Sequence, residues 1–359
     1  MRFALQGVAP RELQARVPEL SAAEARRVIS TIYRRGPECL HGHVPQVRAV
    51  ALDAMRERAW APTLEVIERR ESAVDSFKKV LFATDDGGLI EAVRIPLERA
   101  DRCSVCVSSQ IGCALGCVFC ATGRLGLRRN LAAWEIVEQV RQLRQGLPSG
   151  VRVHGVVFQG MGEPLANIDR VLAAIRVLTD PSALAINARA ITVSTAGLPA
   201  GIRRLAREAP SVRLAISIAS AVPERRRRLM PIDGVHALPQ VIDAAVEHAK
   251  IVRQSPMFAL TLLRGINDGA ADATALADLL LDFEVRTGIR ARLSIIPYNE
   301  IASGSAEGST EPFSRTSKAV EDAFRDVLAA RGVFSHRRYS GGADIAAACG
   351  QLAAKSSEA

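Results

Sequence analysis

The sequence of 359 residues lacks several features that define whole classes of protein. No stretch reaches the roughly 18 consecutive apolar residues of a membrane span, so we expect no membrane segment. The start, from Met1 to Gly7, lacks the long apolar core of a secretory signal, so we expect a cytoplasmic protein. Aromatic residues make up only 4% of the chain, which argues against a surface that binds nucleic acid by extensive base stacking. Internal repeats and low-complexity tracts are also missing.

Cysteine usage and net charge narrow the remaining classes. Seven cysteines are an odd number for a disulfide framework, and five of them lie within the eighteen positions from Cys103 to Cys120. In a reducing compartment this crowding indicates metal or thiol chemistry. The net charge of +9 predicts a surface that attracts polyanions, although charge alone leaves nucleic-acid binding at about even odds.

Hydrophobic periodicity divides the chain into parts. Helical spacing, with Ser21 as the expected N-cap of the second helix, predicts a helical accessory domain over residues 1–75. Strand-like alternation, broken at Asp85-Asp86-Gly87-Gly88, predicts a β-hairpin linker over residues 76–100. Residues 336–359 form a C-terminal segment after the main domain.

Residues 101–335 alternate short apolar strands with longer amphipathic segments, the order that builds a parallel sheet. Six strands are expected, near residues 103–108, 154–160, 190–195, 213–219, 257–263 and 291–297. The fold class is therefore α/β. Six βα units predict a partial (β/α)6 barrel whose reactive groups gather at the carboxyl ends of the strands.

The strongest motif is Cys113-Ala-Leu-Gly-Cys117-Val-Phe-Cys120. This spacing lets one loop wrap three thiolates around a single 4Fe-4S cluster and leaves one iron open. Buried cysteines or a zinc site are the alternatives. Structural zinc normally needs four ligands, and no fourth Cys or His follows at finger spacing.

The aromatic residue before the last of these cysteines, Phe119, is typical of radical SAM enzymes. Further blocks occur in a fixed order, and together they resemble the RlmN/Cfr family of radical SAM RNA methyltransferases. The blocks are Cys106 to Gly123, Arg129-Asn130-Leu131, Gly160-Met161-Gly162-Glu163-Pro164, Ile191 to Gly197, Arg228 to Ile232 and Ala348-Cys349-Gly350-Gln351-Leu352.

The resemblance implies a cluster on Cys113, Cys117 and Cys120, with S-adenosylmethionine (SAM) chelated to its open iron. It places SAM contacts at Gly162, Glu163, Ser194, Ser217, Ile218, Ala219 and Asn299. The family usually has Ser-Leu-His where this chain has Ser217-Ile218-Ala219, so one histidine contact is absent.

The resemblance also implies a chemical role for three residues outside the cluster motif. Cys349 takes a methyl group from SAM, and a radical from a second SAM activates that group, so two SAM are used per turnover. Cys106 then forms a transient disulfide with Cys349 and releases the base. Glu91, in Glu91-Ala-Val-Arg-Ile95-Pro96, corresponds to the family's proton acceptor. Cys39 and Cys103 match no role and are interpreted as structural.

Structured RNA is the expected partner. The resemblance implies methylation of an adenosine ring carbon, C2 or else C8, in 23S rRNA near the peptidyl transferase centre, with tRNA as a further candidate. We expect a flipped adenosine, recognition by RNA shape, a flavodoxin or ferredoxin as electron donor and a monomeric enzyme. The arginines expected to contact phosphates are Arg128, Arg129, Arg225, Arg226, Arg227 and Arg228.

Two alternatives remain at this point. One is a radical SAM RNA-modifying enzyme of altered target or reaction, because Ala219 and Ser340-Gly341-Gly342 depart from the family pattern. The other is a non-catalytic metal-containing RNA-binding protein. Binding alone needs neither Cys106 nor Cys349, so their presence favours an enzyme.

Overall fold

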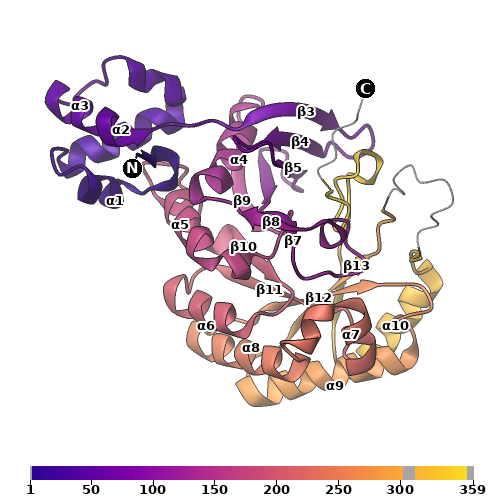
Figure 1. The fold of residues 1–359 in the computed structure, drawn as a ribbon. Coiled ribbons are helices and arrows are strands. Elements are labelled where there is room, and N and C mark those ends of the chain that lie inside the picture. Colours follow the sequence, from indigo (N-terminus) through magenta and orange to yellow (C-terminus); the bar gives the residue numbers. More distant parts are fainter. Residues whose placement is uncertain (1, 302–311, 354–359) are drawn as a thin grey trace.

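The computed structural model describes residues 2–301 and 312–353 (Figure 1), so residues 354–359 of the predicted C-terminal segment lie outside the described part. The strands are β1 (Phe3–Ala4), β2 (Ala59–Trp60), β3 (Glu65–Glu71), β4 (Lys78–Ala83), β5 (Leu89–Pro96), β6 (Arg102–Val107), β7 (Gln110–Cys113), β8 (Gly126–Asn130), β9 (Arg152–Phe158), β10 (Ile191–Thr195), β11 (Arg213–Ser217), β12 (Met257–Leu262), β13 (Arg292–Pro297) and β14 (Ser335–Arg337). The α-helices are α1 (Pro10–Arg16), α2 (Ala22–Arg35), α3 (Ala49–Arg58), α4 (Ala133–Gln145), α5 (Ile168–Thr179), α6 (Pro199–Glu208), α7 (Pro223–Leu229), α8 (Leu238–Val252), α9 (Ala270–Thr287) and α10 (Lys318–Ala330).

One sheet of ten strands organises the molecule, in the order β14-β13-β12-β11-β10-β9-β6-β5-β4-β3. The strands from β6 and β9 to β14 pair in parallel, whereas β3, β4 and β5 add an antiparallel extension next to β6. All six predicted strands are present, and the α/β partial barrel is confirmed.

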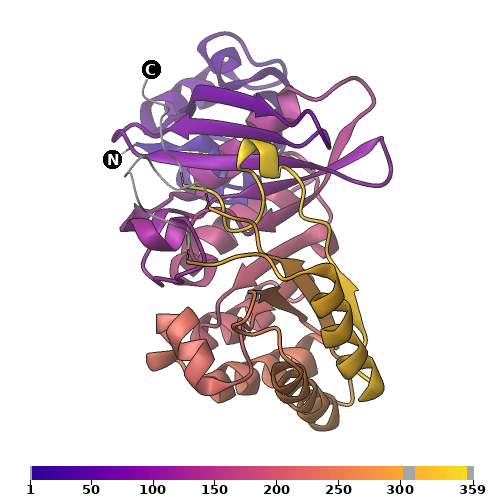
Figure 2. The ribbon, with the colours of Figure 1, turned by 90° about the vertical axis from the view of Figure 1, so that its right-hand side faces the viewer.

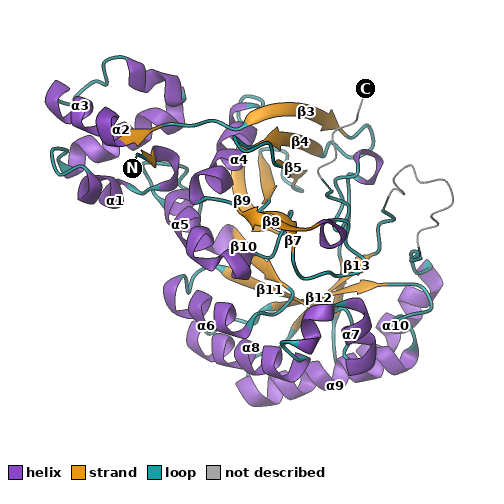
Figure 3. Ribbon diagram, in the orientation of Figure 1, coloured by secondary structure: helices purple, strands orange, loops and turns teal. Residues whose placement is uncertain are grey.

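Helices cover the outer side of the curved sheet and leave its inner side to the C-terminal segment (Figures 1 and 3). Each covering helix buries an apolar stripe, as in α8, where Val241, Ile242, Ala245 and Ala249 are buried against the sheet or its neighbours. Burial of such stripes, at roughly 25 cal/mol per Å² of apolar surface, is the main source of stability in this layer. No helix in the described residues is long and apolar enough to cross a membrane.

The amino-terminal helices α1, α2 and α3 form a separate lobe beside the barrel (Figure 1). Ser21 is the N-cap of α2, as predicted: its hydroxyl accepts from the Glu24 amide, and the Glu24 carboxylate accepts from the Ser21 amide. This capping box satisfies amide groups that have no partner within the helix.

Several elements were not predicted, among them β7, β8, β3 and α7. β3 lies inside the range that was expected to be helical. Its residues alternate between exposed and half-buried, which suits an edge strand, and it pairs with β4. α7 contains the four consecutive arginines Arg225 to Arg228. A proline at its first position and Glu224 in its first turn favour the helix.

Candidate active site

The inner face of the sheet supplies the floor of the site. Successive side chains of a strand point to opposite faces, so residues two apart share a face. Two cavities open along this face and share Cys120, Gln159, Gly160, Cys349 and Gly350. We name them the cofactor cavity, of about 150 Å³ around Cys113 and Cys117, and the cysteine cavity, of about 510 Å³ around Cys106.

The three motif cysteines line the cofactor cavity from the loop between β7 and β8, with Cys113 at the end of β7. Burial raises the pKa of Cys113 to about 11 and also raises the pKa values of Cys117 and Cys120. The neighbouring thiols add to these shifts, which shows that the three groups lie close to one another.

This set of donors fits an iron–sulfur cluster. Soft thiolates suit iron–sulfur clusters, and metal binding keeps such thiols deprotonated although burial opposes it. Within residues 2–301 and 312–353, no three His, Cys, Asp or Glu side chains converge as a ready site for a single ion. A cluster takes each thiolate on a different iron, so its ligands need not meet at one point.

The opposite wall of the cofactor cavity comes from the carboxyl ends of three parallel strands. Five predicted SAM residues line it: Gly162, Glu163, Ser194, Ser217 and Ala219. Gly162 has a φ of +97°, and a Cβ there would lie 2.5 Å from the Gln110 side chain, so only glycine fits. The loop after β9 can therefore press against β7 and present its backbone to the cavity.

Glu163 is held firmly in this wall. Its carboxylate accepts from the amides of Leu165 (3.0 Å) and Ala196 (2.9 Å). Burial raises its pKa, and these two hydrogen bonds oppose the rise. The carboxylate thereby connects the ends of β9 and β10, and it still borders the cavity.

Two predicted SAM residues do not line the cofactor cavity. Ile218 is fully buried, its amide donates to the Ala259 carbonyl, and its own carbonyl accepts from Arg226. Asn299 instead donates to the Ser340 hydroxyl and to the Cys349 carbonyl (3.1 Å). It therefore contacts the loop that carries Cys349.

Cys106 and Cys349 line the same cavity, although 243 positions separate them in the sequence. Cys106 lies on β6, where burial, and then the Cys349 thiol, raise its pKa to about 12. Cys349 is only half-buried and borders both cavities. The structure thus places Cys349 between the cluster cysteines and Cys106.

The loop with Cys349 is fixed by its main chain. The Ala121 amide donates to the Gly350 carbonyl (2.8 Å), and the Thr122 hydroxyl donates to the Leu352 carbonyl (2.5 Å). Both donors follow directly after Cys120. The cluster loop therefore anchors the thiol of Cys349 beside it.

The C-terminal segment is also clasped by the antiparallel extension of the sheet (Figure 2). Asp75 accepts from the Tyr339 hydroxyl and the Gly342 amide, both at 2.8 Å. Lys79 donates to the Ala346 carbonyl. β4 and the turn before it therefore help to set the path of the chain toward Cys349.

Comparison with known proteins decides the family. Residues 107–276 match the Radical SAM superfamily. A "Probable RNA methyltransferase" of Sorangium cellulosum is 54% identical over 95% of this chain and 90% of its own length. The "Dual-specificity RNA methyltransferase RlmN" of Syntrophobacter fumaroxidans is 45% identical over 80% of this chain and 79% of its own length. A crystal structure of a radical SAM methyltransferase from Sphaerobacter thermophilus superposes with a TM-score of 0.86 at 33% identity, covering 98% of this chain and 100% of that one.

The chain belongs to the RlmN/Cfr family of radical SAM RNA methyltransferases. It is a SAM-dependent enzyme with a 4Fe-4S cluster, and RNA is its substrate. This result bears differently on the two alternatives that the sequence raised. A non-catalytic metal protein is excluded, whereas the exact target is treated below as a proposal.

Glu91 lies on β5, away from the lining of either cavity. Its carboxylate pairs with Lys79 at 2.8 Å and accepts from the Ala353 amide at 2.9 Å. Both side chains of this ion pair are buried. Glu91 therefore contacts the C-terminal segment four residues after Cys349.

The expectation that Arg226 contacts RNA is wrong, because its side chain is fully buried. It pairs with Asp233 at 2.9 Å and donates to the carbonyls of Ala196, Ser217 and Ile218. These carbonyls lie at the ends of β10 and β11. Arg226 therefore holds the wall of the cofactor cavity in place.

We predict that Arg226→Ala lowers the free energy of unfolding by about 3–5 kcal/mol, the usual cost of breaking a buried ion pair. The substitution leaves three carbonyls without their guanidinium donor and the buried Asp233 carboxylate with the Leu238 amide but without its buried cation. Urea denaturation measures the effect. Arg227→Ala is the matched control, because Arg227 is 68% exposed and 4.0 Å from Asp233; equal stabilities of the two variants would contradict the assignment.

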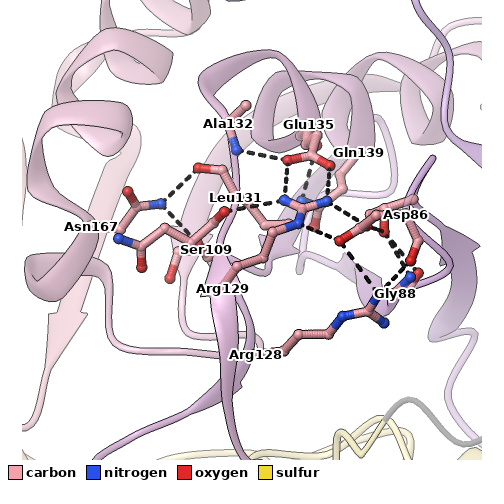
Figure 4. A network of polar contacts seen from close by, with 12 residues as sticks. Asp86, Gly88, Ser109, Arg128, Arg129, Leu131, Ala132, Glu135, Gln139 and Asn167 are labelled. Atoms are coloured by element: carbon pink, nitrogen blue, oxygen red, sulfur yellow. Dashed lines mark hydrogen bonds and ion pairs between the residues drawn. The ribbon is translucent and has the colours of Figure 1, made fainter.

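The other arginines predicted to contact RNA differ in whether their guanidinium groups are free to bind a phosphate. Arg129 bridges Asp86 and Glu135, both at 2.8 Å, and Glu135 also caps α4 (Figure 4). Its guanidinium group therefore has a structural role in these two ion pairs. Arg128 keeps half of its side chain exposed beside Asp86. In α7, Arg225 pairs with Asp272, while Arg227 and Arg228 are exposed.

Two residues that the sequence did not single out belong to the site. Gln159, directly before the Gly160-Met161-Gly162-Glu163 block, borders both cavities. Its position at the end of β9 was the available signal, because strand ends carry active sites in such barrels. Arg338 lines the cysteine cavity and lowers the pKa of Cys106, against the larger effect of burial.

Proposed function

We propose that this enzyme methylates C2 of an adenosine in 23S rRNA through an S-methyl group on Cys349, with tRNA as a second substrate. The observation that carries the proposal is the placement of Cys349 between the three cluster cysteines and Cys106. When bound on Cys113, Cys117 and Cys120, the cluster and SAM supply a methyl group and an oxidising radical. A flavodoxin or ferredoxin is the proposed reductant.

Cys349 is the proposed methyl carrier. Adenine ring carbons are poor nucleophiles, whereas a thiolate displaces a methyl group from a sulfonium readily. Cys349 is half-buried and borders the cofactor cavity, so its sulfur can reach the methyl group of a SAM molecule held there. One hydrogen atom of this methyl group then passes to the radical that SAM supplies. The carbon radical that remains, still attached to the sulfur of Cys349, bonds to the adenine ring.

Cys106 is the proposed resolving residue. After one electron has returned to the cluster and its reductant and the ring proton has passed to Glu91, the Cys106 thiolate attacks the sulfur of Cys349. An S–S bond forms, the S–C bond to the base breaks, and the departing carbon takes up a proton to become the methyl group. Both cysteines line the same cavity of about 510 Å³, a volume typical of small-molecule sites, so a flipped adenosine fits beside them. The resulting disulfide must be reduced before the next turnover.

Glu91 is the proposed acceptor of the ring proton. Its carboxylate is bound to Lys79 and to the Ala353 amide, so a shift of the C-terminal segment would alter what the carboxylate contacts. Cys349 borders both cavities, and Ala353 follows it by four residues, so a movement of Cys349 between SAM and the base would act on this contact. This role rests on the alignment with the family and on this contact.

Mass spectrometry of digested nucleosides tests the target. We expect 2-methyladenosine to appear when unmodified 23S rRNA and tRNA are incubated with enzyme, SAM and a reductant. Detection of 8-methyladenosine alone would move the reaction to the other carbon. Absence of any methylated adenosine, with SAM still cleaved, would favour the altered reaction suggested by Ala219, which lines the cofactor cavity in place of the usual histidine.

A further inference from the structure

A third cavity, of about 420 Å³, continues the cysteine cavity along the inner face of the sheet. The two share Ile95, Val157, Gln159 and Arg338. We name it the amino-end cavity, because it is lined by the first halves of the parallel strands. Its inner-face residues are Ser104, Gly155, Thr192, Arg213, Ala215, Met257 and Arg292.

The strand register shows that the three cavities lie along one continuous face of the sheet. On β11, Arg213, Ala215 and Ser217 share the inner face, and Arg213 lines the amino-end cavity while Ser217 lines the cofactor cavity. β10 repeats the pattern with Thr192 and Ser194. Closed barrels of this class fill their interior with bulky branched side chains. Here part of this interior stays open because it is lined by the small residues Ser104, Gly155, Thr192 and Ala215.

The amino-end cavity is basic. Arg213, Arg292 and Arg338 line it together with His154, and among residues 2–301 and 312–353 no acidic one is part of its lining. Burial, followed by Arg102, Arg152 and Arg213, lowers the pKa of His154, which shows that several guanidinium groups converge here. Asp101 is the acidic side chain beside them, and it pairs with Arg99 and Arg102.

These arginines lack internal partners. In the part of the chain that the structure describes, the guanidinium groups of Arg213, Arg292 and Arg338 make no ion pair or hydrogen bond. By contrast, Arg203 and Arg286 on the outer helices pair with Glu247 and Asp243, each at 2.6 Å. Unpaired guanidinium groups beside an open cavity are available for an anion from outside.

The cavity fits nucleic-acid backbone better than a small anion. It extends from the cysteine cavity, where we propose that the target adenosine binds. The hydroxyl groups of Ser104 and Thr192 and the amide group of Gln254 lie among its cationic side chains. Such polar groups, with arginine, make most protein contacts to phosphate and sugar. The mixture of charge and hydroxyl groups also suits 2′-hydroxyls.

We propose that the amino-end cavity binds the phosphates of the nucleotides that flank the target adenosine, through Arg213, Arg292 and Arg338. This inference rests on the proposed function, because it assumes that the adenosine enters the cysteine cavity. RNA then crosses the inner face of the barrel, and the arginines of α7 are not its main contact.

Salt-dependent binding tests the proposal with the double variant Arg213→Ala/Arg292→Ala. The probe is a transcribed fragment of 23S rRNA that contains the peptidyl transferase centre. Loss of two phosphate contacts should weaken binding about tenfold at 100 mM salt and reduce the slope of log K against log salt by about 1.4 to 1.8. Methylation of Cys349 by SAM without RNA, followed by intact mass, should stay as in the wild type.

The matched control is Arg203→Ala/Arg286→Ala, which removes the same charge from the outer helices and should leave the slope unchanged. If the two double variants bind RNA with the same affinity and slope, the proposal is overturned. The proposed function fails in a different way: the wild type would then methylate no adenosine in this RNA, whatever the binding curves show.

Discussion

Replacing Cys349 with alanine should reduce RNA methylation by at least about a thousandfold, because the variant loses the atom that carries the methyl group. The change should leave the loop intact. Its anchors use main-chain carbonyls of Cys349, Gly350 and Leu352, which alanine at position 349 preserves. Transfer of a labelled methyl group from SAM to RNA measures the effect.

Cys103→Ala provides the matched control for this variant. Cys103 is a buried thiol on the same strand as Cys106, its thiol lies 3.6 Å from the Arg152 carbonyl, and it lines none of the three cavities. We expect it to retain most of its activity. Iron content and SAM cleavage should be unchanged in both variants. Methylation by Cys349→Ala at the rate of Cys103→Ala would rule out the carrier role.

Replacing Cys106 with alanine should trap RNA on the enzyme. Cys349 can still load the methyl group and bond to the base, but no second thiol is present to attack its sulfur. A labelled RNA that migrates with the protein on a denaturing gel, resists thiol reductants and disappears after ribonuclease treatment is the expected result. Turnover of this variant without any adduct would contradict the resolving role.

The wild-type enzyme should resolve this adduct faster as the pH rises. Burial raises the pKa of Cys106 to about 12, so only a small fraction is thiolate at neutral pH. Below that pKa, each unit of pH increases the thiolate fraction about tenfold. Rapid-quench measurement of adduct decay between pH 7 and 9 follows this step in the wild type.

The cluster loop could be predicted because its information is local. Three cysteines within eight positions, an aromatic residue between them and a preceding strand are visible in the sequence itself. The six strands could be predicted equally well, since they are short apolar runs that alternate with amphipathic helices. The placement of Cys349 beside Cys120 required the resemblance to the family, because hydrogen bonds across more than 200 positions fix it.

The arginines show where sequence reasoning failed. Four adjacent arginines in α7 looked like a phosphate-binding surface, yet Asp233 and Asp272 pair with two of them, and a buried partner cannot be read from local charge. Arg213 and Arg292 looked ordinary, each at the start of a strand. The sequence does not show that they line the same cavity. They do so because parallel pairing brings the first residues of these strands to one edge of the sheet.

The most direct test of the methyl-carrier mechanism is the isotope content of the product nucleoside. With SAM that carries a trideuterated methyl group, one deuterium is lost when the methyl group on Cys349 is activated, and a proton replaces it on release. Mass spectrometry should therefore detect methyladenosine with two deuterium atoms. A product that retains all three would show direct methyl transfer and would contradict the role of Cys349.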